Sequence, residues 1–235
     1  MENNQEIIRL ENVSKTFDLR YHKTLRAVDN VSLSLHKGIC TAIVGESGCG
    51  KSTLARMVTL LEPVTDGMIY YKNEPIGGMQ NGRNIALRRE KLREYRRNVQ
   101  MIFQDPYSSL NPSKTIGWLL MEPLRAAGIL DKKCAMSKAD RKAAAYDMLA
   151  RVGMDEKYFH RLPSELSGGQ RQRISIAQAL ITNPGFIIAD EPVSALDVTI
   201  QAQIMELLQK LQEEMNLSYL FISHDINVVY HMCDR

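Results

Sequence analysis

A glycine-rich stretch over residues 45–53 has the residue types and the spacing of a phosphate-binding loop. It reads GESGCGKST and fits the pattern G-x-x-x-x-G-K-[ST]. The glycines let successive backbone N–H groups turn towards a β-phosphate, while Lys51 offers a positive charge to the β- and γ-phosphates and Ser52 a hydroxyl to Mg²⁺. Cys49 is expected to be a small residue that fits the loop. The loop residues are Gly45, Glu46, Ser47, Gly48, Cys49, Gly50, Lys51, Ser52 and Thr53.

Two adjacent carboxylates follow an apolar run later in the chain. Residues 186–189 read FIIA and lead into Asp190 and Glu191. A buried strand holds its last side chains rigidly at the edge of the sheet where ligands bind. Asp190 is therefore a candidate for the Mg²⁺ shell, directly or through water, and Glu191 is a candidate to orient or deprotonate an attacking water. The pair alone also fits the start of a loop, and its combination with the phosphate loop favours the metal-assisted site.

The elements that must position these residues alternate between strand and helix. Residues 39–44 are a continuous apolar run, which predicts a strand buried on both faces that ends at the glycine loop. A helix over residues 52–61 is expected to follow the loop. The same alternation returns after residue 169 and predicts a mostly parallel sheet covered by helices. Further strands are predicted near 7–13 and over 28–35, 68–71, 99–103, 186–189 and 217–222, with helices over 169–182 and 199–215.

The middle of the chain has a different character. Between residues 105 and 164 there is little strand signal, whereas residues 115–127 and 137–152 have helical patterns. Ser137 with Asp140 three positions later predicts a capping box at the start of the second helix. This block is expected to be a helical subdomain set into the α/β core.

Composition limits the class of protein. The chain has 235 residues, of which 44% are hydrophobic and 24% charged, with a net charge of +3. No apolar run approaches the ~18 residues that cross a bilayer, and the charged first ten residues do not resemble a signal peptide. We therefore expect a soluble cytoplasmic protein. The small net charge gives no argument for nucleic acid as a partner, and the basic stretch 88–97 is expected to be a solvated surface because glutamates interrupt it.

The cysteines give no sign of a metal or redox motif. Cys40, Cys49, Cys134 and Cys233 are scattered along the chain and form no C-x-x-C pair. They are expected to be reduced, structural thiols.

The pentapeptide LSGGQ at residues 166–170 resembles the signature motif of ABC ATPases. Physically it is a second anion site, with a hydroxyl, two bare backbone N–H groups and a helix N-terminus. The resemblance implies that this motif closes on the γ-phosphate of ATP bound to the opposite subunit of a head-to-tail dimer. ATP and Mg²⁺ are the implied cofactors. The residues expected to contact the nucleotide from this motif are Ser167, Gly168, Gly169 and Gln170.

Further residues match ABC motifs in the family's order. Gln104 resembles the glutamine that contacts Mg²⁺ and the attacking water, and His224 resembles the switch histidine at the γ-phosphate. Asp197 ends SALD, which is similar to the D-loop at the dimer interface. Phe17 matches the aromatic that stacks on adenine, with Tyr21 as the weaker candidate. On this basis the catalytic residues are Glu191, His224, Gln104 and Lys51, and the metal-binding residues are Ser52, Gln104 and Asp190.

The implied fold is a P-loop NTPase core of the α/β class. It has a mostly parallel sheet with helices, additional antiparallel strands near the N-terminus and an inserted helical subdomain. The expected divisions are 1–104 for the first part of the core, 105–168 for the helical subdomain, and 169–235 for the second part of the core. ABC subunits usually continue well past the switch histidine, so the chain is expected to be either truncated at its C-terminus or a naturally short form.

The stretch MIFQDPYSSLNP at residues 101–112 is more selective, because it resembles the same region in the ATP-binding subunits of oligopeptide, dipeptide and nickel importers. This likeness implies a second ABC ATPase as partner, with a heteromer favoured over a homodimer. It also implies permease subunits, an extracytoplasmic solute-binding protein, and a peripheral position at the cytoplasmic face of the membrane. Trp118 could help to receive a coupling helix of the permease, although core packing is the commoner fate of such a residue.

Three alternatives remain open. An ABC ATPase without a transport role usually carries long coiled-coil insertions or two ATPase units, and neither occurs here. A non-hydrolysing, nucleotide-gated interaction module would lack Glu191 or His224, yet both are present. An exporter-type subunit is disfavoured by residues 101–112. The transported solute cannot be read from the chain, because selectivity resides in the partner subunits.

Overall fold

The computed structural model describes residues 5–19, 23–80, 83–85, 89–130 and 134–234. Tyr21 and Arg88 lie outside these ranges. The chain divides into two compact units, which are described separately. The first unit combines Met1–Arg96 with Ser218–Arg235, and the second is the continuous segment Arg97–Leu217.

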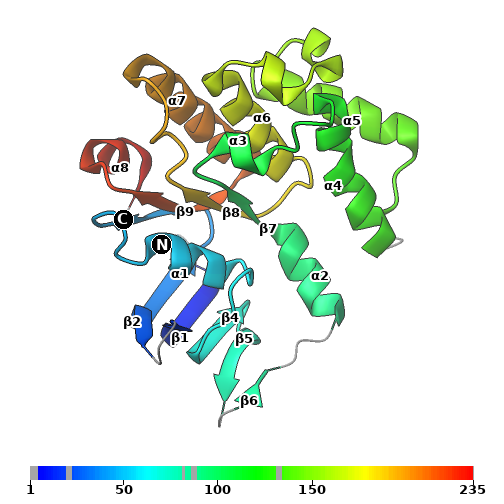
Figure 1. Cartoon of the computed structure of the whole chain (residues 1–235). Coiled ribbons are helices and arrows are strands. Elements are labelled where there is room, and N and C mark those ends of the chain that lie inside the picture. The colour runs from blue at the N-terminus through cyan, green and yellow to red at the C-terminus, as the bar shows by residue number, and fades with distance from the viewer. Residues whose placement is uncertain (1–4, 20–22, 81–82, 86–88, 131–133, 235) are drawn as a thin grey trace. The chain divides into compact units, whose positions relative to one another are not determined.

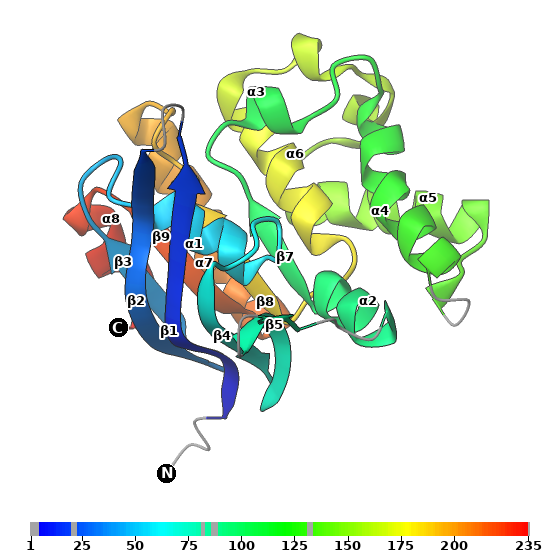
Figure 2. The same ribbon diagram turned by 60° about the horizontal axis from the view of Figure 1, so that its bottom comes forward.

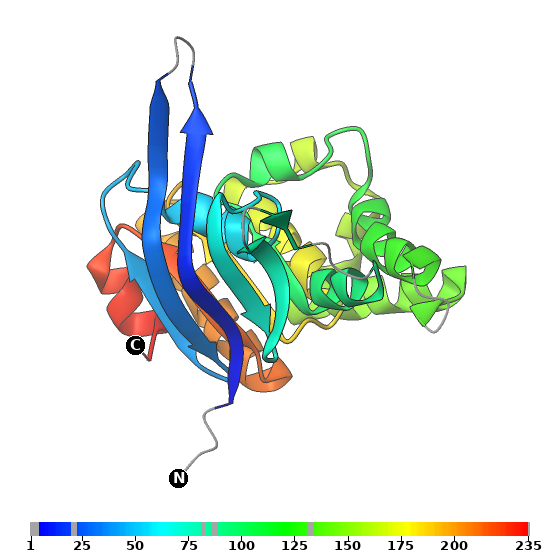
Figure 3. The ribbon, with the colours of Figure 1, turned by 90° about the horizontal axis from the view of Figure 1, so that it is seen from below.

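An antiparallel sheet forms most of the first unit. Its strand order is β2-β1-β4-β5-β6, and every neighbouring pair is antiparallel. Figures 2 and 3 show β1 and β2 as two long strands side by side, with β4 next to β1. The apolar side chains of Ile8, Leu35 and Ile69 are fully buried beneath this sheet. The strands are β1 (Glu6–Asp18), β2 (Thr24–His36), β4 (Asp66–Tyr71), β5 (Glu74–Gln80) and β6 (Arg83–Asn84).

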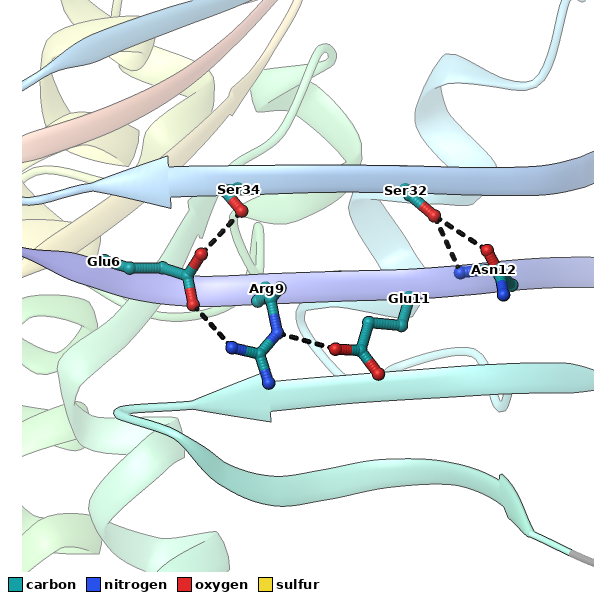
Figure 4. A network of polar contacts seen from close by, with 6 residues as sticks. All are labelled: Glu6, Arg9, Glu11, Asn12, Ser32 and Ser34. Carbon is teal, nitrogen blue, oxygen red and sulfur yellow. Dashed lines mark hydrogen bonds and ion pairs between the residues drawn. The ribbon is translucent and has the colours of Figure 1, made fainter.

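Polar contacts cross the other face of β1 and β2 (Figure 4). Glu6 accepts a hydrogen bond from Ser34 at 2.6 Å and forms an ion pair with Arg9 at 3.0 Å, while Arg9 pairs with Glu11 at 2.9 Å. Because a one-residue slip would move this set to the buried face, the apolar and polar faces together fix the register of the two strands.

Two parallel strands in the first unit carry the predicted phosphate loop. β3 (Cys40–Val44) pairs with β9 (Ser218–Ser223), and α1 (Lys51–Val58) follows the loop. α8 (Ile226–Met232) packs against both strands. The strands predicted at 39–44 and 217–222 and the helix predicted from residue 52 are thus confirmed, although α1 ends three residues earlier than expected.

The basic stretch predicted to be a solvated surface is a helix, α2 (Arg89–Asn98). Tyr95 is its one fully buried side chain among the described residues of the helix, and its hydroxyl donates a hydrogen bond to the carbonyl oxygen of Val58 in α1. The Tyr95 ring also packs edge-on against Tyr71 of β4, with centroids 5.1 Å apart. Burial raises the pKa of Tyr95, so the phenol stays neutral at ordinary pH.

Tyr95→Phe should lower the free energy of unfolding by about 1–3 kcal/mol, because it leaves the buried Val58 carbonyl without its partner. The aromatic contact with Tyr71 would remain. Urea unfolding followed by circular dichroism measures the effect. Tyr230→Phe is the matched control, since Tyr230 is 83% exposed and loses the same atom. Equal stability of the two variants would show that the Tyr95 hydroxyl contributes nothing.

The second unit contains two parallel strands and most of the helices. β7 (Val99–Ile102) pairs with β8 (Phe186–Asp190). Three helices, α4, α5 and α6, pack against one another, as Figure 1 shows. The helices of this unit are α3 (Pro106–Ser109), α4 (Ile116–Leu130), α5 (Lys138–Arg151), α6 (Gly168–Leu180) and α7 (Val198–Met215), with two short 3₁₀ turns, η3 (Glu156–His160) and η4 (Pro163–Glu165).

The helical character predicted for the middle of the chain is present. Between 105 and 168, outside residues 131–133, the structure contains helices and no strand. The capping box predicted for α5 is confirmed, because the Ser137 hydroxyl oxygen accepts from the Asp140 N–H and the Asp140 carboxylate accepts from the Ser137 N–H. The boundaries at 104 and 168 stay predictions. Within the described residues, no helix is long and apolar enough to span a bilayer.

Candidate functional site

The glycine loop between β3 and α1 holds Lys51 in a closed arrangement. The Lys51 side chain is 7% exposed, and its Nζ donates to the carbonyl oxygens of Gly45 at 2.7 Å and Glu46 at 2.8 Å. The loop is closed on itself by the backbone N–H of Cys49, which donates to Glu46 O at 3.4 Å. The ammonium group thus lies over the loop, and its carbonyl contacts can be exchanged for phosphate oxygens, which carry more negative charge.

Two loop positions require glycine. Gly48 and Gly50 have φ values of 82° and 101°, in the left-handed region. A Cβ added at Gly50 would lie 2.1 Å from the carbonyl oxygen of Ala27 in β2, so space as well as conformation excludes a side chain. At Gly45 an added Cβ would meet Cys49 Sγ at 2.8 Å. Cys49 therefore fits as a small residue against Gly45, as expected from the sequence.

Gly50→Ala should abolish binding of nucleoside triphosphate, because the added Cβ would lie 2.1 Å from the Ala27 carbonyl oxygen and the loop must distort to relieve this clash. Isothermal titration of the variant with Mg-ATP measures the loss. Gly185→Ala is the control, because no atom lies within 4 Å of the position of its added Cβ. Nucleotide affinity equal to that of the unmodified chain would contradict the assigned role of the loop.

Other predicted residues of the first unit lie near element ends. Ser52 and Thr53 are half-buried in the first turn of α1. His224 is exposed directly after β9, one residue before Asp225, which caps α8. Phe17 is half-buried near the end of β1 with Lys15 Nζ 4.8 Å from its ring centroid. The weaker candidate, Tyr21, lies outside the described residues.

In the second unit, Gln104 and Glu191 meet. Parallel pairing places Ile102 of β7 beside Ala189 of β8. Gln104 lies two positions after Ile102, and Glu191 lies two positions after Ala189. Gln104 Nε2 donates to Glu191 Oε2 at 3.0 Å. Asp190, the last residue of β8, is 4% exposed. Glu191 has a φ of 46°, in the left-handed region, which turns the chain sharply at the carboxylate.

The signature pentapeptide begins α6. Ser167 is the N-cap, and its Oγ accepts a hydrogen bond from the Gln170 N–H at 3.3 Å while Gln170 Oε1 accepts from the Ser167 N–H at 3.0 Å. Gln170 Nε2 also donates to the hydroxyl of Tyr158 at 3.0 Å. Since Ser167 Oγ accepts in the cap, its own proton can still be donated to an anion. The motif is therefore preorganised at the helix end.

The two glycines of the motif lie close to residues near the start of α7. A Cβ added at Gly169 would lie 2.6 Å from Ile200 Cγ2, and one at Gly168 would lie 3.6 Å from Leu196. Asp197 is the N-cap of α7, with Oδ1 accepting from the Ile200 N–H at 3.0 Å. A larger residue at position 169 would therefore push α6 away from Ile200.

Sequence reasoning missed two positioning contacts. Ser194 Oγ donates to the backbone oxygen of Glu191 at 3.1 Å and holds the turn that carries the carboxylate. The guanidinium of Arg171 lies 3.8 Å from the ring centroid of Tyr107, and Arg171 Nε donates to Pro163 O at 2.6 Å. The segment after Gln104 is thereby fixed to the start of α6. Only Ser194 had a signal in the sequence, as part of the D-loop motif.

Charged side chains stabilise the turn that precedes the signature motif. Glu165, two residues before Ser167, accepts a hydrogen bond from the Leu162 N–H at 2.6 Å and pairs with Arg161 at 2.6 Å. Both contacts hold the pKa of the exposed Glu165 carboxyl below its usual value. The turn preceding the motif therefore keeps its cap at neutral pH.

The predicted metal ligands have suitable chemistry for Mg²⁺. Ser52, Gln104 and Asp190 supply a hydroxyl, an amide and a carboxylate oxygen, all hard donors, and Mg²⁺ is usually held by one or two protein groups together with water and substrate phosphates. The described part of the chain contains no cluster of three or more His, Cys, Asp or Glu side chains that could hold a metal.

Comparison with known proteins places these features in a family context. A family model described as "ABC transporter" matches residues 28–194. An oligopeptide transport ATP-binding protein of Bacillus subtilis is 47% identical over 240 residues, covering 99% of this chain and 69% of the relative. A dipeptide transport ATP-binding protein of Escherichia coli is 45% identical over 213 residues, covering 91% of this chain and 60% of the relative. The chain thus spans 60% to 69% of the length of these two curated relatives.

A solved structure gives the same result for the fold. An ATP-binding cassette, solved as a dimer in a post-hydrolysis state bound to ADP and Pi, matches with a TM-score of 0.80 and 33% identity. The match covers 96% of this chain and 91% of that one. The predicted α/β fold class with a P-loop core is confirmed.

Proposed function

The chain belongs to the ABC transporter family, and from this premise we propose that it binds and hydrolyses Mg-ATP as the motor subunit of an importer for peptides or a similar small solute. The observation that carries the proposal is the contact between Gln104 and Glu191 at the ends of two adjacent parallel strands. This contact holds a carboxylate ready to act on a water molecule. The printed functions of the relatives, oligopeptide and dipeptide transport, support the substrate class.

Each predicted site residue then has a distinct task. Lys51 and the N–H groups of the loop bind the phosphates, with Lys51 exchanging the carbonyls of Gly45 and Glu46 for phosphate oxygens. Glu191 orients and partly deprotonates the attacking water, and Gln104 fixes the carboxylate that does so. Mg²⁺, when bound, neutralises charge on the phosphate oxygens, and Ser52, Gln104 and Asp190 would hold it. His224 contacts the γ-phosphate, and Phe17 stacks on adenine.

Partners complete the proposed machine. The Ser167–Gln170 segment contacts the nucleotide bound to a second ABC ATPase, and a heteromeric pair is favoured. The dimeric state of the similar cassette supports this arrangement. In the second unit, Tyr107 and Trp118 are 64% and 40% exposed, so these aromatic side chains are available to permease subunits. The protein would act at the cytoplasmic face of the membrane, with a solute-binding protein outside it.

Lys51→Ala tests the proposal. Turnover of ATP by the purified chain should fall to background, and Mg-ATP affinity should fall with it, because the phosphates lose their main cationic ligand. Phosphate release and nucleotide titration measure the two effects. Lys37→Ala removes an exposed lysine after β2 and should leave both unchanged. Undiminished turnover in the Lys51 variant would reject the proposed site.

The transport role needs a separate readout. In cells that lack their own peptide-importer ATPase, expression of this protein should restore uptake of a labelled dipeptide, and expression of its Lys51→Ala form should not. If ATP hydrolysis is normal but no peptide or nickel is taken up, the assignment as an ATPase would stand and the assignment as an importer subunit would be rejected.

A further inference from the structure

Two cysteines far apart in the sequence lie against each other in the first unit. Cys40 is the first residue of β3 and is fully buried, and Cys233 directly follows α8 and is half-buried. They are 193 positions apart in the chain, and their Sγ atoms are 3.0 Å apart, in hydrogen-bonding contact. The sequence, which lacks any C-x-x-C spacing, gives no hint of this pair.

The backbone around the pair holds it in place. The N–H of Cys40 donates to Asp234 Oδ2 at 2.9 Å, and the N–H of Asp234 donates to the carbonyl oxygen of Cys40 at 2.9 Å. α8 packs on β3 and β9 just before Cys233. The thiols are thus fixed in contact by both flanking segments, and forming an S–S bond of about 2.05 Å requires a movement of only about 1 Å.

We propose that Cys40 and Cys233 form a reversible dithiol–disulfide pair, a covalent modification site that responds to small disulfides such as oxidised glutathione. The inference does not depend on the proposed function. In the oxidised form, the segment after α8 is covalently joined to the beginning of β3, the strand that leads into the phosphate loop. In a reducing compartment the pair is the dithiol, and it is oxidised when the proportion of glutathione disulfide rises.

The chemistry balances with one glutathione disulfide per pair. The Cys233 thiolate attacks one sulfur of the glutathione disulfide, that S–S bond breaks, and the first glutathione leaves as a thiolate. Cys40, after losing its proton, then attacks the Cys233 sulfur of the mixed disulfide and releases the second glutathione. The two protons pass to the two glutathione thiolates, so two protein thiols are oxidised and one glutathione disulfide is reduced to two glutathione molecules.

The order of these steps follows from the surroundings. The hydrogen bond with Cys233 and burial raise the pKa of the Cys40 thiol, which makes it a poor first nucleophile. Cys233 is more accessible to a tripeptide disulfide. Once Cys233 carries glutathione, Cys40 is already in contact with the sulfur that it must attack, so the second step is intramolecular.

The remaining cysteines have different settings. Cys49 is exposed in the phosphate loop, and Cys134 in the second unit accepts a hydrogen bond from Arg97 at 2.6 Å. Any general oxidation of thiols would reach the exposed Cys49 first. Selective linkage of Cys40 to Cys233 would therefore distinguish the proposed pair from general oxidation of thiols.

The test is a redox titration of the whole chain in glutathione buffers of increasing oxidised fraction. Samples are quenched with acid, and free thiols are alkylated before mass analysis. Trypsin alone leaves Cys40 and Cys49 on one fragment, Gly38–Lys51, so a second protease that cleaves after Glu46 is needed to separate them. We expect the fragment that ends at Glu46 to be disulfide-linked to the fragment that carries Cys233. The linkage should occur within a single chain, lower the mass by two hydrogens and be fully reversed by dithiothreitol.

Matched variants make the result decisive. Cys233→Ala should abolish the linked fragment and leave a free thiol at Cys40, whereas Cys134→Ala should leave the linkage and its midpoint unchanged. Cys233 is the better position to replace, because it is half-buried, whereas Cys40→Ala would leave a cavity in the core. Both thiols remaining alkylated at every oxidised fraction, or linkage only to Cys49 or between chains, would overturn the proposal.

Discussion

Replacing Glu191 with Gln should lower the rate of ATP hydrolysis by about 10²–10⁴-fold, the range typical for removing a general base, while ATP binding persists. The amide keeps the shape of the side chain, and its oxygen can still accept the hydrogen bond from Gln104 that the carboxylate accepts at 3.0 Å. What it loses is the negative charge that orients and deprotonates water. Steady-state phosphate release gives the rate, and titration with Mg-ATP gives the affinity.

The matched control is Glu213→Gln on α7, an exposed carboxylate that should leave the rate unchanged. The slow variant also allows closure to be seen, since bound ATP is no longer consumed. Light scattering with and without Mg-ATP then distinguishes the two kinds of dimer. A doubled mass with Mg-ATP would mean that two copies of this chain pair, and an unchanged mass despite ATP binding is the result expected for the favoured heteromer. A Glu191 variant that turns over at the unmodified rate would remove Glu191 from the mechanism.

Ser167→Arg should lower the rate of ATP hydrolysis by at least about 10²-fold, while the affinity for a single ATP stays unchanged. In the proposed head-to-tail dimer, Ser167 does not contact the nucleotide held by its own phosphate loop. It contacts the nucleotide of the partner, so a bulky arginine blocks closure rather than binding. Titration with Mg-ATP and phosphate release separate the two effects.

The structure supplies an unusually close control for this variant. Ser137 caps α5 with the same reciprocal hydrogen-bond pattern that Ser167 uses at α6. Ser137→Arg should cost the same ~0.5–2 kcal/mol of helix capping without affecting turnover. Equal loss of activity in both variants would mean that the Ser167 effect is one of folding, and normal turnover in the Ser167 variant would reject a shared site.

Local patterns predicted the parts of the site that depend on neighbouring residues. The glycine spacing of 45–53 predicted the loop, and the φ values of Gly48 and Gly50 give its physical reason. The apolar runs 39–44 and 186–189 predicted strands β3 and β8. The capping box of Ser137 was visible because both of its partners lie within one turn. The individual site roles stay predictions.

Features that depend on distant residues were not predictable in the same way. α2 was missed as a helix because its charged sequence has no apolar periodicity, and a single tyrosine, Tyr95, is fully buried in it. The stacking of Arg171 on Tyr107 and the contact between Cys40 and Cys233 join residues that only the tertiary fold brings together. No local propensity encodes such pairs.

The discontinuous first unit has a consequence for how the chain is made. β3 emerges from the ribosome early, yet its partner β9 comes much later, as the bond from Gly38 to Ser218 across 180 positions illustrates. At ~5–20 residues per second, β3 waits about 10–40 s for β9, because the whole continuous segment Arg97–Leu217 is synthesised before β9. During this interval the strand that leads into the phosphate loop exposes an apolar edge. Chaperone binding to nascent chains should therefore peak before residue 218 is synthesised and decline once β9 has emerged.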